Sequence, residues 1–453
     1  IPTALDLLRS GAWVAHSTIP NVHPPGVEAY LVVWYKLFGF SIPITRIAML
    51  LVAAGGLVLT FLLAIELSGD APGAPAFVPP ILLVVSPLFY TQSMMAQLDM
   101  PAMVLTLLAL LLFIKKYYVA SAVACMVLVL TKETGLVAPA VFCILFVVRK
   151  DWKRALLFAS PAVPLAAWLV FLHAKTGYWL GDPGFAHYNV GYALNPMRAV
   201  FSLARRAYYL FFAEFRWIGT LALIWVIRKH NVLRGWAWRV TLLVSGATAI
   251  LVSVLGGAEL ERYLLPVLPV LYIAFSIAFA HLPERVSIVV IAGLLVALVG
   301  NLFWNPPYPF PYENNYAMVD FVRLQRTAAV WAQTSYPGRT IATAWPFTAA
   351  LRSPDYGYVS RKLHVVETGD FHTASIEALP ADKFDVLITY TRTWSPPGGA
   401  ITMPLVERFL ARFYEWQPDI TTDDCERLGL RQEASWTLHG QTVKIYVRES
   451  TFR

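Results

Sequence analysis

The stretch Gln97-Leu98-Asp99-Met100-Pro101 places an acidic residue between two apolar segments, 77–90 before it and 102–114 after it. An ionised carboxylate at or just inside a membrane surface is costly, and such residues usually serve a function. Pro101 suits the first turn of a helix, where no backbone N–H donor is required. We therefore expect Asp99 to lie at a helix N-terminus and to face an aqueous cavity. The alternative is an interfacial residue that only caps the helix.

The composition of the whole chain indicates a membrane protein. Of its 453 residues, 57% are hydrophobic and 14% are charged, and the mean hydropathy is +0.57. Soluble domains carry about 25% charged residues. The net charge of +8 comes from basic residues that gather in short loops between apolar runs. This pattern is typical of cytoplasmic loops, so nucleic acid is not an expected partner, whereas membrane lipids are.

The apolar runs predict about ten membrane spans, and several are shorter than the ~20 residues of a perpendicular helix. An amphipathic helix over 1–13 and an aromatic-rich apolar helix over 27–38 precede them. The predicted spans are 41–67, 76–90, 100–114, 117–130, 135–148, 155–173, 208–227, 237–256, 263–281 and 286–304.

The basic loops orient these spans. If the spans alternate, the basic loop residues all fall on one side, at 115–116, 149–154 and 228–234. The positive-inside rule makes that side cytoplasmic. Asp99, the long loop 174–207 and everything after residue 304 then lie on the opposite side. We expect a multi-pass protein of the plasma (inner) membrane, with its polar site and C-terminal domain extracytoplasmic.

The composition changes abruptly after a proline-rich segment. We expect an all-α polytopic membrane domain over 1–304, a stiff linker over 305–311 and a small extracytoplasmic α/β domain over 312–453. In this last domain the pattern predicts helices over 319–333 and 403–413 and strands over 339–344, 363–367, 384–390 and 443–447.

The predicted outer face collects the residue types that carry chemistry: His23, Asp99, Lys132, Glu133, His187 and Arg262. Carboxylate, imidazole and cation together can bind an anionic headgroup and deprotonate a nucleophile. Each of these residues also has a simpler interpretation, in which it takes no part in chemistry. The two histidines could be unengaged loop residues, Lys132 and Glu133 a locally paired turn, and Arg262 an anchor at the membrane surface. The sequence contains no P-loop, G-x-G-x-x-G, paired Cys-x-x-Cys or H-E-x-x-H motif.

Several short motifs follow one another over residues 1–304, namely Leu8-Arg9-Ser10-Gly11-Ala12-Trp13, His23-Pro24-Pro25, Phe38-Gly39 with Arg46, Leu98-Asp99-Met100-Pro101, Thr131-Lys132-Glu133-Thr134-Gly135 and Arg262-Tyr263-Leu264-Leu265-Pro266. This order resembles the GT-C membrane glycosyltransferases. The most similar subgroups are the dolichyl-phosphate-mannose protein mannosyltransferases and the bacterial aminoarabinose transferases. The resemblance implies an inverting glycosyltransferase that takes a sugar from a polyprenyl-phosphate donor and passes it to an extracytoplasmic protein, lipid or glycan.

The resemblance also implies roles for the candidate residues. Asp99 matches the second acidic position of the family and is the expected catalytic residue of this chain. His23, Lys132 and Arg262 are expected to bind the donor phosphate, with support from Glu133 and His187. A divalent metal ion is compatible with this chemistry, although no ligand spacing in the sequence defines a site for one.

The sequence departs from the family pattern at several of these positions. The family's first acidic motif would precede Ile1, so we expect the chain to be truncated at its N-terminus. His23 stands where relatives carry a stronger cation, and Val22 stands where they often carry glutamate. Around His187, Ala186 and Val190 replace the usual acidic and basic neighbours.

Two other functions are compatible with the same sequence. A transporter or lipid flippase would show internal repeats or broken spans in corresponding halves. The sequence has no such repeat, and its polar residues gather at one membrane face rather than at the midplane. A member of the family that binds a lipid-linked sugar without transferring it is the other alternative. The sequence favours the transferase.

The charge asymmetry makes the orientation testable. Single cysteines in 229–234 should resist a membrane-impermeant thiol reagent in intact cells, whereas cysteines in 177–195 should react. The parent protein, with its three native cysteines, provides the background signal. Labelling of both sets, or the reverse pattern, would exclude this topology.

Overall fold

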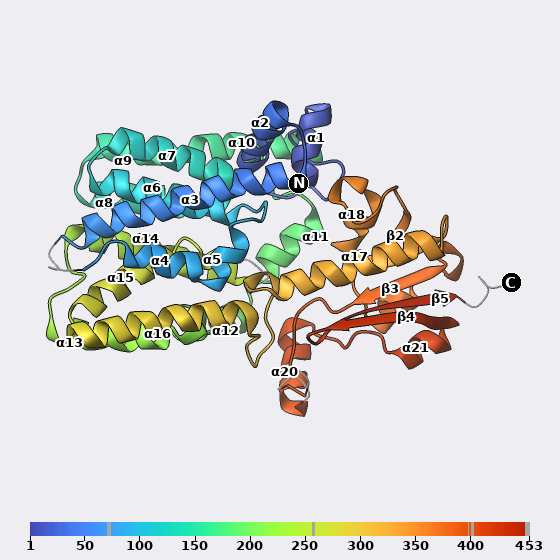
Figure 1. Ribbon diagram of the computed structural model, residues 1–453. Coiled ribbons are helices and arrows are strands. Elements are labelled where there is room, and N and C mark those ends of the chain that lie inside the picture. Colours follow the sequence, from blue (N-terminus) through green and yellow to red (C-terminus); the bar gives the residue numbers. More distant parts are fainter. Residues whose placement is uncertain (70–73, 256–258, 397, 400–402, 449–453) are drawn as a thin grey trace. The chain divides into compact units, whose positions relative to one another are not determined.

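The computed structural model describes residues 1–69, 74–255, 259–396, 398–399 and 403–448. The chain divides into two compact units, Ile1–Trp304 and Asn305–Arg453 (Figure 1). The first unit is helical, and the second is built around a five-stranded sheet.

Apolar helices dominate the first unit, so the protein is a membrane protein. Among the described residues, four helical segments are long and apolar enough to cross a membrane, namely α3 (Ile42–Leu67), α9 (Trp152–Ala159) continued by α10 (Ala162–Thr176), α14 (Trp236–Val254) and α16 (Glu284–Phe303). Shorter apolar helices are α6 (Asp99–Ile114), α7 (Tyr118–Thr131), η1 (Glu133–Leu136) with α8 (Val137–Val148), and α15 (Leu268–Ala280). The number of about ten spans stays a prediction.

The remaining helices of this unit are short or amphipathic. They are α1 (Pro2–Ser10), α2 (Gly26–Phe38), α4 (Val78–Val85), α5 (Pro87–Gln92), α11 (Pro183–Ala186), η2 (His187–Gly191), α12 (Pro196–Phe211), η3 (Ala213–Phe215), α13 (Trp217–Lys229) and η4 (Glu261–Leu264).

The helices differ from the predicted spans at several breaks, one of which divides the run 155–173 between α9 and α10. The run 76–90 is split between α4 and α5, because Ser86 precedes Pro87 and adopts an extended conformation. The run 208–227 is split between α12 and α13, where Glu214 has a φ of 54°. The predicted loop 174–207 is largely helical, since it contains α11, η2 and most of α12. Gly256, the last residue of the predicted span 237–256, lies outside the described residues.

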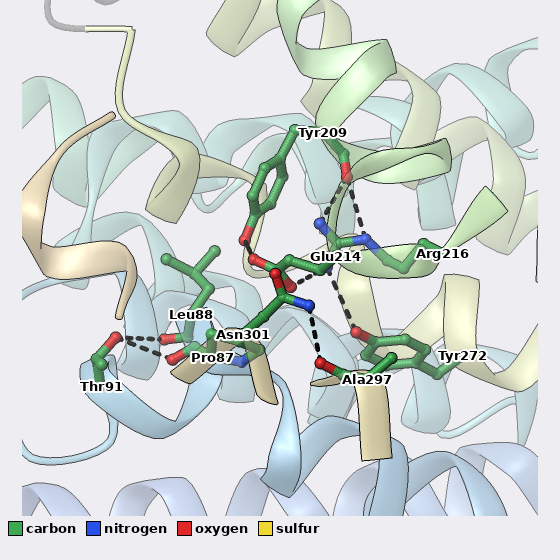
Figure 2. A network of polar contacts seen from close by, with 9 residues as sticks. All are labelled: Pro87, Leu88, Thr91, Tyr209, Glu214, Arg216, Tyr272, Ala297 and Asn301. Carbon is green, nitrogen blue, oxygen red and sulfur yellow. Dashed lines mark hydrogen bonds and ion pairs between the residues drawn. The ribbon is translucent and has the colours of Figure 1, made fainter. Parts of the chain in front are cut away.

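A buried polar network fixes the corner between α12 and α13. Figure 2 shows the guanidinium of Arg216 between the backbone carbonyl of Tyr209, the carboxylate of Glu214 and the hydroxyl of Tyr272. Arg216 Nε donates to the Tyr209 carbonyl at 3.0 Å, and Nη1 donates to Glu214 Oε2 at 2.9 Å. Tyr209 in turn donates its hydroxyl to Glu214 Oε1 at 3.1 Å. Because the Arg216 side chain is 0% exposed, this pairing is what allows a charge to lie there.

Aromatic packing and an apolar exterior complete the first unit. Phe113 of α6 stacks on Phe142 of α8 with ring centroids 3.9 Å apart, and Phe158 of α9 joins the same buried cluster. On the outside, apolar residues such as Val289 and Val296 of α16 are exposed. An exterior of this kind suits contact with lipid rather than water.

The second unit is a small α/β fold, and its elements confirm the helices and strands predicted there. They are η5 (Tyr312–Asn314), α17 (Ala317–Ser335), β1 (Thr340–Ala344), α18 (Phe347–Arg352), η6 (Pro354–Tyr356), β2 (His364–Thr368), α19 (Thr373–Glu377), η7 (Ala381–Lys383), β3 (Val386–Tyr390), α20 (Pro404–Tyr414), α21 (Thr422–Arg427), β4 (Leu430–Leu438) and β5 (Gln441–Arg448). The strand order is β2-β1-β3-β5-β4. The β1–β2 and β1–β3 pairs are parallel, and β5 runs antiparallel to β3 and β4.

Strand β4 was not predicted, because it lies at the edge of the sheet and carries polar residues on both faces of much of its length. It pairs with β5 through a tight turn, in which His439 and Gly440 both have positive φ. Such a two-residue turn matches the twist of a hairpin.

The proline-rich segment 305–311, predicted as a stiff linker, belongs to the second unit and contributes Phe310 to its core. Phe310 is 2% exposed and belongs to the hydrophobic core. Its backbone N–H donates to the Trp394 carbonyl at 3.1 Å, and the two rings lie 5.4 Å apart. The core of this unit therefore begins before Tyr312.

This packing predicts the boundary of an independently folding fragment. Residues 305–453 expressed alone should be soluble and unfold cooperatively, and Phe310→Ala should destabilise the fragment by about 3–5 kcal/mol through the cavity it leaves. Denaturant unfolding, monitored by circular dichroism, measures the cooperativity of unfolding and the change in stability. Leu405→Ala is the matched control, because Leu405 is exposed and should change stability by no more than about 0.5 kcal/mol. Aggregation of every such fragment would contradict an independent fold.

Candidate functional site

Asp99 is the first residue of α6, and its side chain is 5% exposed. Lys132 Nζ donates to its Oδ1 at 2.5 Å, and Arg262 Nε forms an ion pair with its Oδ2 at 3.0 Å. Leu98, not Asp99, occupies the N-cap position of α6. The carboxylate is therefore held between two cations that come from distant parts of the chain, and it does more than cap a helix.

The segment Lys132-Glu133-Thr134-Gly135 brings one of these cations into place. Lys132 ends α7 in an extended conformation, with φ −155° and ψ 130°. Glu133 then begins the short helix η1. The chain packs closely against the end of α7 at Gly135. Glycine is required there, because a Cβ would lie 2.6 Å from Leu128 Cγ. The backbone thus turns Lys132 and Glu133 in different directions within one tight segment.

The second cation comes from η4, which precedes α15. Arg262 lies between Glu261 and Tyr263, and Glu261 is buried and paired with Arg205 of α12. Arg205 Nε and Nη2 donate to Glu261 Oε1 at 2.9 and 2.6 Å. This pair ties η4 to α12. Lys132 Nζ lies 4.2 Å from the centre of the Tyr263 ring, a cation–π distance.

His23 joins the same region through Glu133. His23 Nδ1 lies 2.8 Å from Glu133 Oε2, so the carboxylate accepts a hydrogen bond from that nitrogen and fixes the orientation of the ring. Gly26, the first residue of α2, makes this possible. A Cβ on Gly26 would lie 2.4 Å from the Leu130 carbonyl oxygen, so α2 can approach the end of α7 only with glycine at this position.

The structure therefore brings together five of the six candidate residues: His23, Asp99, Lys132, Glu133 and Arg262. His187 lies in η2, and none of the hydrogen bonds or ion pairs found for the described residues connects its side chain with Asp99, Lys132 or Glu133. Asp6, the acidic residue nearest the N-terminus, also has a different role. It accepts hydrogen bonds from the backbone of His16 and Ser17 and braces its own loop.

A cavity opens beside Asp99, Lys132 and Tyr263, and we call it the ionic cavity. It contains about 360 Å³ of empty space. Away from the charged residues its walls are small or apolar, and they come from α6, α8, α14 and neighbouring segments, with Ala102, Thr106, Val137, Ala138, Thr248 and Val252 among them. An ionic end and an apolar body thus share one space.

Arg206 of α12 is a residue that the sequence analysis missed. It is 2% exposed, and its Nε and Nη2 have no hydrogen-bond partner among the described residues. Its Nη1 donates to Ser202. The carboxylates of Glu259 and Glu261 attract its positive charge. The only signal in the sequence was the spacing of Arg198, Ser202 and Arg206 on one face of an amphipathic helix, and such a face would normally be assigned to solvent.

The side chains do not assemble a metal site in the described part of the chain. No group of three or more His, Cys, Asp and Glu residues converges there. Both oxygens of Asp99 already face cations. We therefore assign no step to a metal ion. What the cluster can do is hold two cations beside an apolar cavity, which suits an anionic group on an apolar chain.

The comparison with family models finds no match for this sequence, and the comparison with curated proteins finds none either. Among solved structures, the chain is similar to ArnT from Cupriavidus metallidurans bound to undecaprenyl phosphate. The TM-score is 0.56 at 16% identity, covering 98% of this chain and 92% of that chain. ArnT in the apo state gives 0.54 at 17% identity, with the same coverage of both chains.

The chain is also similar to the archaeal oligosaccharyltransferase AglB from Archaeoglobus fulgidus, in complex with an inhibitory peptide and a dolichol-phosphate. Here the TM-score is 0.50 at 11% identity, covering 85% of this chain and 64% of that chain. ArnT and AglB are GT-C glycosyltransferases. The chain therefore has the GT-C fold, as the order of its motifs predicted.

The pairing of Asp99 makes a stability prediction. Asp99→Asn should lower the free energy of unfolding by about 3–5 kcal/mol, because it leaves the buried Lys132 and the partly buried Arg262 without a counter-charge. Adding Lys132→Met should restore part of this loss, and a double-mutant cycle from thermal unfolding in detergent measures the coupling.

The control for this cycle is the ion pair between Lys115 and Glu66, which is partly exposed. Glu66→Gln should cost no more than about 1 kcal/mol. An Asp99→Asn protein as stable as wild type, or additive single and double variants, would contradict the buried ionic cluster.

Proposed function

We propose that this protein, which has the GT-C fold, is an inverting glycosyltransferase that moves a sugar from a polyprenyl-phosphate donor to an extracytoplasmic acceptor. The observation that carries the proposal is the ionic cavity, whose lining combines Lys132 and Asp99 with apolar residues such as Val137 and Val252. A polyprenyl-phosphate sugar has the matching chemistry, since it joins an anionic phosphate to an isoprenoid chain. The acceptor class, whether protein, lipid or glycan, is left open by these features.

The transfer is a displacement at the anomeric carbon. The acceptor oxygen forms a bond to this carbon while the bond from the carbon to the phosphate oxygen breaks, and the electron pair leaves with the phosphate. The acceptor proton passes to a general base. Lys132 and Arg262 are suited to stabilise the charge that grows on the departing phosphate. Attack from the face opposite the phosphate inverts the anomeric configuration.

We assign Asp99 a positioning role in this reaction. Its two oxygens are engaged by Lys132 Nζ and Arg262 Nε, at 2.5 and 3.0 Å. A carboxylate in this state is a poor proton acceptor, but it sets the separation and direction of the two cations. Asp99 was the expected catalytic residue from sequence, and we propose instead that it acts through Lys132 and Arg262.

Arg206 is a further cation that we propose for the donor phosphate. Its Cζ lies 6.0 Å from the centre of the Tyr263 ring, the same ring that Lys132 approaches on the ionic cavity. Lys132 and Arg262 are paired with Asp99, whereas Nε and Nη2 of Arg206 have no hydrogen-bond partner among the described residues. A phosphate oxygen would supply the partner that its buried nitrogens lack.

The position of the charged residues along their helices supports a transferase over a transporter. Asp99 begins α6, Lys132 follows α7, and Arg262 lies in η4 before α15. All three are therefore at helix ends rather than in the middle of a span, whereas transporters hold their substrate near the bilayer midplane. We propose that these ends lie on the extracytoplasmic side, as the loop charges predict.

The proposal is tested with purified protein, undecaprenyl phosphate as the binding probe and a set of undecaprenyl-phosphate sugars as donors. Lys132→Met should weaken undecaprenyl phosphate binding by ~10-fold through loss of a charge-assisted contact, and should lower transfer by ~10²-fold. Arg262→Lys should retain part of the activity, because a point charge replaces the guanidinium fork.

Lys153→Met is the matched control, because Lys153 is an exposed lysine of α9, and it should leave binding and transfer unchanged. Appearance of free undecaprenyl phosphate together with glycosylated product supports a transferase. Movement of intact lipid-linked sugar across vesicles, without its consumption, would favour the flippase. Wild-type binding and transfer by Lys132→Met would contradict the proposed phosphate site.

A further inference from the structure

A second cavity lies in the first unit and is lined in part by His23, and we call it the aromatic cavity. It contains about 380 Å³ of empty space, and its lining includes Trp13, Asn21, His23, Glu28 and Trp168. Small-molecule sites combine apolar walls with a few polar groups. The lining of this cavity has that composition.

Two tryptophans contribute to its apolar surface. Trp13 follows α1 and is 51% exposed, so much of its indole ring is available. Trp168 of α10 is almost completely buried, and its Nε1 donates to the Val22 carbonyl at 2.9 Å. That bond holds the indole of Trp168 against the loop that precedes His23. The two rings come from different segments of the chain, and both border one space.

Its polar groups include a carboxylate and an imidazole. Glu28 of α2 accepts a hydrogen bond from Thr3 Oγ1 at its Oε1, at 3.1 Å. Its Oε2 is buried and has no hydrogen-bond partner among the described residues. A buried acceptor without a partner costs about 1–3 kcal/mol, more if it is charged. Glu28 therefore presents a site for a donor group such as a hydroxyl.

We propose that the aromatic cavity binds a sugar ring, with the apolar face of the ring against Trp13 and a ring hydroxyl donating to Glu28 Oε2. A sugar ring has this pair of surfaces, since its C–H groups form an apolar face and its hydroxyls form a polar rim. Tryptophan offers a large flat apolar partner for the first. A carboxylate is a strong acceptor for the second.

His23 connects this cavity with the ionic cluster. It lines the aromatic cavity and pairs with Glu133 through Nδ1, and Glu133 adjoins Lys132, which lines the ionic cavity. A sugar ring in the aromatic cavity is therefore separated from the proposed phosphate site by a short chain of side chains. The inference rests on the proposed function and deepens it by assigning the sugar-binding subsite.

The experiment uses the full chain in detergent and saturation-transfer-difference NMR with the methyl glycosides of mannose, glucose, galactose and arabinose. At least one glycoside should receive saturation, strongest at its ring C–H protons. Trp13→Ala and Glu28→Gln should each weaken its binding by about tenfold or more, and Trp13→Phe should bind with intermediate strength. Trp152→Ala and Glu284→Gln are controls, because both residues are exposed on other helices, and they should bind like wild type.

Undecaprenyl phosphate binding, measured on the same proteins, separates this inference from the proposed function. It should be unchanged in Trp13→Ala and Glu28→Gln. Silence of every glycoside while undecaprenyl phosphate still binds would overturn the sugar site and leave the phosphate site standing. Glycoside binding that survives both substitutions unchanged would place the sugar elsewhere and overturn the inference. Loss of undecaprenyl phosphate binding in the wild-type protein would overturn the proposed function itself.

Steady-state transfer kinetics distinguish whether the sugar ring in this cavity belongs to the lipid-linked donor or to the acceptor. If the cavity holds the donor sugar, Trp13→Ala should raise the KM for the lipid-linked donor by about tenfold and leave the KM for the acceptor unchanged. If the cavity holds a sugar acceptor, Trp13→Ala should raise the KM for the acceptor by about tenfold and leave the KM for the donor unchanged. An unchanged KM for both substrates would contradict a sugar site in this cavity.

Discussion

The carboxylate of Asp99, held between Lys132 and Arg262, is the interaction on which the candidate site depends. It connects the start of α6 with the segment after α7 and with η4. In a chain whose surroundings are largely apolar, none of these charges is tolerated alone, because unpaired buried ions cost several kcal/mol each. The pairing therefore imposes a geometry on three helix ends, and it leaves one net positive charge beside a cavity with apolar walls.

The two cavities of the first unit are joined by polar side chains. The ionic cavity has Lys132 at its border, the aromatic cavity has His23, and Glu133 contacts His23 while adjoining Lys132 in sequence. Both cavities are lined by apolar and polar residues, but two tryptophans line the aromatic cavity, whereas Asp99 and Lys132 line the ionic cavity. The short segment that turns Lys132 and Glu133 apart is thus the element that relates the two spaces, and Gly26 and Gly135 allow the close packing on either side of it.

Much of this site was visible in the sequence, because charged residues are conspicuous within apolar runs. Asp99, Lys132 and Arg262 were selected on that basis, and the GT-C fold was predicted from the order of short motifs. The sequence did not show which of these residues contact one another. His23 and Glu133 are 110 positions apart, so their contact depends on the packing of α2 on α7. Arg206 was missed because its amphipathic helix buries a polar face, against the usual pattern. Strand β4 was missed because an edge strand needs no apolar alternation.

The network around Arg216 has a consequence for how the chain enters the membrane. Its main partners are close in sequence, with Glu214 two positions away and Tyr209 seven. The corner between α12 and α13 can therefore neutralise its own charge as soon as it is synthesised, before Tyr272 is available. Asp99 and Lys132, in contrast, are 33 positions apart, and Arg262 is made later still. One buried ion pair can form within a single corner of the chain, whereas the other requires three distant segments of the first unit to be in place.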